Sequence, residues 1–388
     1  MPDPDARSRA RTRGALALAV FAAGLATFAS CRAREGVRAE HDPVASGWSA
    51  EVARLDSLPA LPSALPGREF WIGAWVGPPP AANDAATWRR YAAAGLDVTM
   101  VPLEDRYRRA DNLARLAVLD LLRAAGTDSI LAIVRDDALH PDETTRPGWE
   151  ARLDSVVAAY AGFHSLAGLM LADEPVPAAL AQWAPLARRI AHLDPVHPAY
   201  VNFAGLSYAA SVDAAARQRW QDDLVHAVEE ADLRFFTVDS YPFRPEGETA
   251  NYLASLRETA RASHATARPF GFCLQWTGHG PLHPPTAAEA SYAAMQALGH
   301  GATSLVWFTY WTPNPREEPS FWHGGAVEYD ARSSARHDTL AALDRVVRRV
   351  AAWRGPRPML VVHAGGGLPQ GLRDDVGRVV PGVRTIEG

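Results

Sequence analysis

The chain has 388 residues, of which 48% are hydrophobic and 21% charged, enough apolar material for one large core or two smaller ones. This composition is that of a globular protein. The formal net charge of −5 provides no broad basic field, which excludes an electrostatic basis for nucleic-acid binding and leaves uncharged ligands such as sugars compatible.

Residues 1–30 have the pattern of an export signal. Their apolar run, Ala15–Phe28, is too short to span a bilayer comfortably and follows four arginines, Arg7, Arg9, Arg11 and Arg13. The run ends in Phe28-Ala29-Ser30-Cys31, which resembles the lipobox of bacterial lipoproteins except that Phe28 stands where Leu is usual. This resemblance implies a lipid on Cys31 that anchors the exported chain to the membrane of the bacterial cell envelope. The departure at Phe28 leaves ordinary secretion, as a soluble or periplasmic protein, as the alternative.

Residues 31–66 carry scattered charge, several prolines and little apolar periodicity, which predicts a flexible tether ahead of a folded domain. The chain has two cysteines, and Cys273 has no obvious disulfide partner once Cys31 carries the lipid. Because Cys273 lies in an apolar run, we predict a buried thiol. No Cys or His cluster has zinc-site spacing, so we expect neither a metal nor another cofactor.

Eight short β-rich runs alternate with longer amphipathic runs from Glu69 onward, and their starting residues are 28 to 37 apart. The runs are Glu69–Val76, Asp97–Glu104, Ser129–Asp136, Leu166–Asp173, Ala199–Phe203, Phe235–Tyr241, Pro269–Trp276 and Thr303–Trp311. This alternation predicts an α/β fold in which eight parallel strands close into a (β/α)8 TIM barrel over residues 67–356. The main rival, a doubly wound open sheet, is disfavoured because no Gly-rich turn follows the first run.

Between the strands lie eight helical patterns with recognisable ends. Asn83 or Asp84 precedes the first pattern and Gly95 follows it, as expected for helix caps. The predicted helices are Ala85–Ala94, Asn112–Ala125, Arg152–Ala161, Ala178–His192, Asp213–Glu230, Thr249–His264, Ala287–Leu298 and Ser334–Trp353. Residues 357–388 contain one strand-like run, Pro358–Val362, and a Gly- and Pro-rich end, which fits either a β-sandwich remnant or a disordered tail.

The residues that close the predicted strands are rich in aromatic and polar groups, and the active site of such a barrel lies at this end of its strands. They are Trp75, Glu104, Asp105, Arg135, Asp136, Asp137, Asp173, Glu174, Asn202, Asp239, Tyr241, Gln275, Trp276, Tyr310 and Trp311. Aromatic faces stack on sugar rings, while carboxylates and amides bind hydroxyl groups and supply proton chemistry. The sequence therefore predicts a carbohydrate site.

Several of these positions have a purely structural alternative. Packing of the barrel can explain Trp75, Trp276, Tyr310 and Trp311, and a loop or salt-bridge role is expected for Glu104, Asp136 and Asp137. The motif Asp173-Glu174-Pro175 also makes a good helix start, with Asp as the cap and Pro in the first turn. Asp239 shares a strand face with Thr237 and Tyr241, so it points into the barrel mouth or caps the next turn.

Motifs spread from about Phe70 to Val362 resemble those of the clan A glycoside hydrolases, most closely the β-galactosidase-like barrels of family 42. They are Trp71–Trp75, Leu169–Pro175, Asp194-Pro195 with Tyr200–Asn202, Val238–Pro242, Pro284–Glu289, and Gly301–Ser304 with Trp307–Trp311. This resemblance implies that Glu174 is the acid/base glutamate at the end of strand four. It departs from the clan at the preceding position, where Asp173 replaces an asparagine that binds the sugar 2-hydroxyl, and so places a second negative charge beside the acid.

A larger departure lies at the end of strand seven, where the clan carries its nucleophilic glutamate and this chain carries Gln275. An amide cannot act as that nucleophile. Three accounts stay open: a different second carboxylate, a different alignment of the strands, or a barrel that binds sugars without cleaving them. Asp239 is the first choice of partner, and Glu317 or Glu318, in the loop Pro313–Gly325, is the second.

The leading hypothesis is glycosidic-bond hydrolysis at the barrel mouth of a carbohydrate substrate. Glu174 protonates the leaving oxygen, and Asp239 activates water or stabilises the oxocarbenium-like state. The residues expected to hold the sugar are Trp75, Asp173, Asn202, Tyr241, Gln275, Trp276, Tyr310 and Trp311.

Two alternatives come from other functional classes. One is a surface lipoprotein that binds glycan without cleaving it, which the amide of Gln275 motivates. The other is a metal-dependent hydrolase that uses His279, His283 or His323, although loop hydrogen bonding explains these histidines more simply because no acidic residue accompanies them at ligand spacing.

Overall fold

The computed structural model describes residues 60–355 apart from residues 62, 64, 66, 101–107, 128, 176–179, 207–212, 245–249 and 315–322. Several predictions fall outside these residues: the export signal with Cys31, most of the tether, Glu104, Asp105, Glu317, Glu318 and the run Pro358–Val362. Of the described helices, none is long and apolar enough to cross a membrane.

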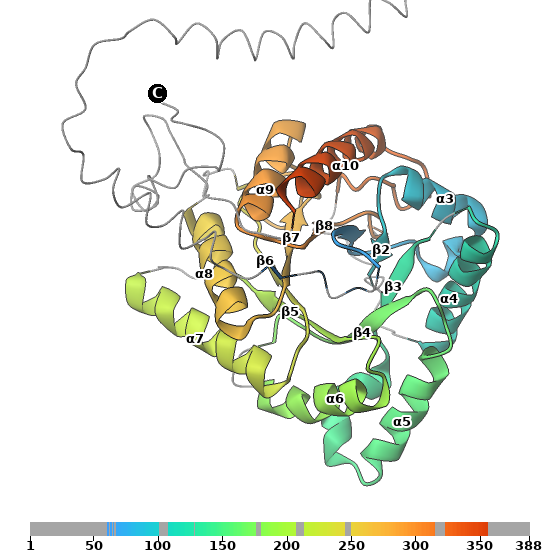
Figure 1. The fold of residues 1–388 in the computed structure, drawn as a ribbon. Helices are drawn as coiled ribbons and strands as arrows, with labels where there is room; N and C mark the ends of the chain where they lie inside the picture. Colours follow the sequence, from blue (N-terminus) through green and yellow to red (C-terminus); the bar gives the residue numbers. More distant parts are fainter. Residues whose placement is uncertain are drawn as a thin grey trace, which may run out of the picture. The chain divides into compact units, whose positions relative to one another are not determined.

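Eight parallel strands close into a barrel in which each strand pairs with the next along the chain and β8 pairs with β1 (Figure 1). The strands are β1 Trp71–Ala74, β2 Val98–Thr99, β3 Leu131–Val134, β4 Leu166–Asp173, β5 Ala199–Ala204, β6 Phe236–Asp239, β7 Phe270–Gln275 and β8 Ser304–Phe308. Each lies within or nearly within a predicted β-rich run, so the predicted (β/α)8 barrel is confirmed.

Helices surround the barrel (Figure 1). They are α3 Ala85–Ala93, α4 Arg109–Ala124, α5 Trp149–Tyr160, α6 Leu180–Leu193, α7 Ala214–Glu230, α8 Ala250–Thr266, α9 Ala287–Gly299 and α10 Ala335–Arg354. Short 3-10 helices are η2 Pro80–Ala82, η3 Asp137–Leu139 and η4 Pro141–Thr145. The predicted cap of the first pattern is confirmed, because the side chain of Asp84 accepts a hydrogen bond from the backbone N–H of Thr87. Asp173 belongs to β4 and does not begin a helix.

The interior of the barrel is filled by side chains from alternate strand positions, as expected for a barrel of eight strands. Phe235 packs between Trp71 and Tyr200, with ring centroids 5.6 and 5.8 Å away. Gly271 of β7 allows close packing at this level, since a Cβ there would lie 2.2 Å from Oγ of Ser304. The layer is therefore a packed core that closes the barrel beneath its C-terminal mouth.

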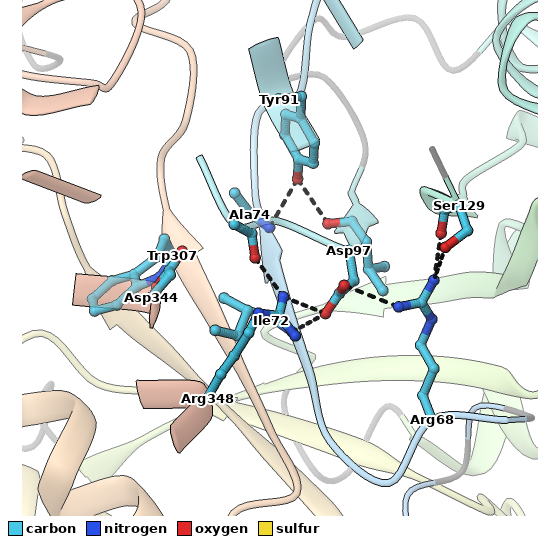
Figure 2. Close-up of polar contacts among 11 residues, drawn as sticks. Arg68, Ile72, Ala74, Tyr91, Asp97, Ser129, Trp307, Asp344 and Arg348 are labelled. Carbon is cyan, nitrogen blue, oxygen red and sulfur yellow. Dashed lines mark hydrogen bonds and ion pairs between the residues drawn. The ribbon is translucent and has the colours of Figure 1, made fainter. Parts of the chain in front are cut away.

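At the opposite, N-terminal end of the barrel, Asp97 joins parts of the chain that are far apart in the sequence (Figure 2). Its carboxylate accepts hydrogen bonds from the guanidinium groups of Arg68 (2.9 Å) and Arg348 of α10 (2.6 Å). It also accepts one from the backbone N–H of Ile72 in β1 (3.0 Å). Arg68 donates in turn to Ser129, just before β3. These contacts tie the first three strands to the last helix.

Candidate active site

The C-terminal ends of four neighbouring strands bring together a compact polar cluster in the barrel mouth. Asp173 lies opposite Asn202 in the pairing of β4 with β5, and Asp239 lies opposite Cys273 in the pairing of β6 with β7. Glu174 follows directly after β4, and its backbone N–H donates to the carbonyl oxygen of Asn202 (2.8 Å). The strand register therefore places two carboxyl groups, those of Asp173 and Asp239, beside the Asn202 amide, with Glu174 next to Asp173 in the chain.

Asn202 is the bridge of this cluster. Its Nδ2 donates one hydrogen bond to Oδ1 of Asp173 (2.9 Å) and one to Oδ2 of Asp239 (3.2 Å). Its Oδ1 accepts from Oγ1 of Thr237 (2.7 Å) and Sγ of Cys273 (3.4 Å). The side chain is 1% exposed, and both amide hydrogens are used within the protein. Asn202, predicted to hold the sugar, thus has no N–H left for a sugar hydroxyl.

Glu174 and Asp239 form a pair of unequal exposure. Glu174 is exposed, whereas Asp239 is 3% exposed and accepts a further hydrogen bond from the hydroxyl of Tyr241 (3.4 Å). Oδ1 of Asp239 is buried and receives no hydrogen bond from an N–H or O–H group of the described residues. The carboxyl of Glu174 lies within hydrogen-bonding reach of Asp239.

Burial and neighbouring negative charges favour the protonated forms of Asp239 and Asp173. Burial raises the pKa of Asp239 well above its usual range, the adjacent charge and hydrogen bond of Glu174 raise it further, and the Asn202 amide opposes the shift. Asp173 has an exposed surface toward the mouth, but neighbouring protein partly desolvates its carboxyl group and so raises its pKa to about 6. Burial and the adjacent charge both favour the protonated form of the Asp239 carboxyl over its ionised form.

Glu174 has a left-handed backbone, with φ of +47°. Non-glycine residues rarely adopt this conformation, which costs roughly 1–2 kcal/mol. Such a conformation persists where the surrounding structure enforces it, and it is found preferentially at functional sites. Here the hydrogen bond from the backbone N–H of Glu174 to Asn202 fixes the turn that follows β4.

A second layer of polar side chains lies beneath the carboxyl groups. Nε1 of Trp75 donates to Sγ of Cys273 (3.4 Å), and the hydroxyl of Tyr200 bonds to that of Thr237 (2.6 Å). The prediction that Cys273 is buried is confirmed. Tyr200 and Thr237 were not among the predicted site residues, although strand alternation places them on the same inward faces as Asn202 and Asp239.

Three rings lie beside the cluster. Tyr241 stacks on Phe308 with ring centroids 5.2 Å apart, and His279 packs edge-on against both rings. Burial lowers the pKa of His279 to about 4, so the imidazole is neutral near pH 7. Of these rings only Tyr241 was predicted to hold the sugar. Phe308 was detectable as the last inward-facing position of β8.

Gln275 is buried and bonded entirely to main chain. Its Oε1 accepts from the backbone N–H of Phe243 (3.0 Å), and its Nε2 donates to the carbonyl oxygen of His283 (2.6 Å). The side chain therefore holds the segments that follow β6 and β7. At the position where the resemblance implies a nucleophile, the chain has a structural amide.

The remaining predicted aromatic ligands are packed away from the carboxyl groups. Trp276 lies between Trp307 (ring centroids 5.5 Å apart) and the guanidinium of Arg336 (4.3 Å from its ring centroid). Tyr310 packs on Tyr91 of α3 (4.6 Å), and Trp311 lies under the guanidinium of Arg90 (5.8 Å). All three are buried, and their positions fit the alternative of barrel packing.

The salt-bridge expectation for Asp136 is confirmed. Its carboxylate pairs with Arg109 (2.8 Å) and accepts from the hydroxyl of Tyr160 (2.8 Å). Asp137 is the first residue of η3.

The three histidines proposed for a metal-dependent hydrolase have other partners. His283 bonds to Glu289 (3.2 Å), and His323 pairs through its backbone with Gly278. Within the described part of the chain, no three His, Cys, Asp or Glu side chains are grouped so that they could hold a metal ion. The described histidines therefore offer no geometry for that hypothesis.

Comparison with known proteins gives matches among solved structures only. No protein-family profile matches the chain, and no curated protein matches it. A β-galactosidase from Rahnella sp. R3 is 13% identical with a TM-score of 0.53, over 79% of this chain and 60% of that one. A glucosidase from Croceicoccus marinus is 14% identical with a TM-score of 0.51, over 74% of this chain and 69% of that one. These matches show a shared barrel fold, and the chain spans 60% of the length of the Rahnella enzyme.

Proposed function

We propose that this chain hydrolyses a glycosidic bond at the C-terminal mouth of its barrel, with Glu174 as the general acid and Asp239 as the second carboxyl group. The observation that carries the proposal is the proximity of an exposed carboxyl, Glu174, and a buried one, Asp239, whose protonated form is favoured by burial. Most glycosidases use two carboxyl groups on either side of the scissile bond. The two similar solved structures are named as a β-galactosidase and a glucosidase, which supports the same reaction class.

The exposure of each carboxyl suits its proposed role. Glu174 can reach a substrate oxygen because it is exposed, as a general acid must. Asp239 is held by Asn202 and Tyr241, so it can stabilise positive charge on the sugar from a fixed position. The stacked rings of Tyr241 and Phe308 offer an apolar face to a sugar ring.

The contact also implies a movement. Carboxyl groups are ~5–5.5 Å apart in retaining glycosidases and ~6.5–9.5 Å apart in inverting ones, both longer than a hydrogen bond. Entry of a sugar must therefore separate Glu174 from Asp239. The exposed Glu174 is free to rotate, whereas two donors hold Asp239 in place. We infer that the contact is the resting state of the pair.

The experiment is an assay of the purified chain against a panel of glycosides, with β-galactosides first because of the likeness to family 42. The variants are Glu174→Gln and Asp239→Asn, with Glu150→Gln, an exposed glutamate of α5, as the matched control. Removal of a general acid is expected to lower turnover by about 10²–10⁴-fold. Full activity of Glu174→Gln on a glycan that the wild type cleaves would remove Glu174 from the mechanism.

A second candidate function is glycan binding without cleavage. It is favoured by one observation, that Gln275 is a main-chain-bonded amide where the resemblance implies a nucleophile. Binding of a glycan by calorimetry, with no product released over hours by the wild type, would establish this function in place of hydrolysis.

We also infer from the sequence that the chain is exported and anchored through a lipid on Cys31. The support is the arginine-led apolar run that ends in Ala29-Ser30-Cys31. Such an anchor would hold the barrel at the cell envelope, where polysaccharide substrates are accessible.

A further inference from the structure

We infer that Thr237 is a positioning residue for the carboxyl pair: its hydroxyl fixes the orientation of the Asn202 amide, which then directs one N–H to Asp173 and one to Asp239. The resemblance to the clan A enzymes implies no role for Thr237. The inference rests on the proposed function only for its kinetic readout. Thr237 precedes Asp239 by two residues on β6, so both side chains point into the barrel. Thr237 is fully buried.

The direction of the hydrogen bonds follows from the chemistry of the amide. Oδ1 of Asn202 can only accept, so the hydroxyl of Thr237, 2.7 Å away, must donate to it. That use of its single hydrogen leaves Thr237 as an acceptor toward Tyr200, whose hydroxyl is 2.6 Å away. The donors therefore run in one direction, from Tyr200 through Thr237 and Asn202 to the two carboxyl groups. Buried chains of this kind strengthen each member.

Without Thr237, a second arrangement of the amide becomes competitive. A rotated Asn202 would direct its oxygen at Asp239, and a protonated Asp239 could donate to that oxygen. The amide oxygen would then hold the proton of Asp239. In the observed arrangement Oδ2 of Asp239 instead accepts from the Asn202 amide, and Oδ1 is buried without a hydrogen bond from the described residues. The weak S–H donor of Cys273, 3.4 Å from Asn202, is a poor substitute for a hydroxyl.

The titratable groups that face Asp239 can be told apart. They are Asp173, Glu174, Tyr200, Tyr241 and Cys273. Burial raises the pKa values of Tyr200 and Cys273 well above their usual ranges, so both stay neutral at neutral and acidic pH. Above the pKa of about 4 of His279, which packs against Tyr241, proton release near neutral and mildly acidic pH therefore belongs to the carboxyl groups.

The test is an infrared titration of the protonated carboxyl band, assigned to Asp239 by its loss in Asp239→Asn. Thr237→Val removes the hydroxyl and keeps the shape. Because an N–H donor stabilises the ionised carboxylate, loss of a fixed amide should raise the midpoint by about one pH unit, a tenfold change in the ionisation equilibrium. Thr237→Ser, which keeps the hydroxyl, should titrate with the wild type. Thr259→Val is the matched control, because Thr259 is a buried threonine of α8 that donates to Ser255.

A folded Thr237→Val variant with the same titration midpoint as the wild type overturns the inference. A Thr237→Ser variant whose midpoint shifts as far as that of the valine variant overturns it too. If the valine variant does not fold, Tyr200→Phe removes the donor to Thr237 and should raise the midpoint by a smaller amount; no shift there contradicts the inference. For an active enzyme, kcat should show the same shift of its pH profile with KM unchanged. A chain that shifts in the infrared but cleaves no glycoside retains the inference and loses the proposed function.

Discussion

Glu174 combines an exposed carboxyl with a left-handed backbone, and the second property has a measurable cost. We expect Glu174→Gly to be more stable than Glu174→Ala by about 0.5–1 kcal/mol, because glycine adopts positive φ without strain but loses more freedom on folding. Both variants remove the carboxyl, so their difference isolates the backbone. Urea unfolding measures it. An alanine variant as stable as the glycine variant would show that the turn after β4 carries no strain.

Asp173 predicts a pH dependence of stability. Its folded-state pKa of about 6 lies above the value of roughly 3.9 for an unfolded aspartate. The folded state thus holds the proton more tightly, so this contribution to stability is present below about pH 4 and is lost as the pH rises through 6. Between about pH 4 and pH 6, the melting temperature of Asp173→Asn should therefore fall less steeply with rising pH than that of the wild type. Parallel curves would mean that Asp173 titrates as it does in the unfolded chain.

Side-chain contacts were the least predictable part of the site. The sequence placed Glu174, Asp239, Asn202 and Tyr241 at strand ends, and the closed barrel brings them together. The two hydrogen bonds that the Asn202 amide donates to carboxyl groups could not be predicted, because they depend on the register between strands distant in the sequence. The position of Trp276 was predictable: Gln275 points inward, so its neighbour on the strand points toward the helices.

At the scale of the element, the N-terminal ends of β1, β2 and β3 depend on a single carboxylate. Asp97 is mostly buried and bonded to Arg68, Arg348 and the backbone of Ile72 (Figure 2). Asp97→Ala should lower the free energy of unfolding by about 2–4 kcal/mol, because it leaves two guanidinium groups and one N–H without their partner. The control is Asp222→Ala at an exposed position of α7. Equal urea midpoints for the two variants would contradict this role.

Elements themselves were well predicted, for a physical reason. Each strand is a short apolar run, and most helices are amphipathic runs with a cap or a glycine at one end, so local pattern and fold agree. The predicted and observed ends of a strand differ by a few residues where the β-rich run continues beyond the residues that pair in the barrel. The strand β8 was predicted to reach Trp311 but ends at Phe308. Beyond Phe308 the chain makes loop contacts, which periodicity does not report.

At the scale of the whole molecule, the proposed lipid anchor predicts where the protein resides. Expressed in a bacterium that processes lipoproteins, the wild type should incorporate labelled palmitate and sediment with membranes. Cys31→Ser should do neither, because the thiol is the only attachment point of the proposed lipid. A wild type recovered unlabelled in the soluble fraction would favour ordinary secretion.

The central claim, that Glu174 protonates a leaving glycosidic oxygen, is tested most directly by changing the leaving group. Kcat/KM of the wild type and Glu174→Gln is compared on two substrates with the same sugar, one with an alkyl or sugar leaving group and one with dinitrophenolate, which needs no protonation. The proposed role predicts a loss of about 10²–10⁴-fold on the first substrate and little loss on the second. Equal losses on both substrates would contradict it.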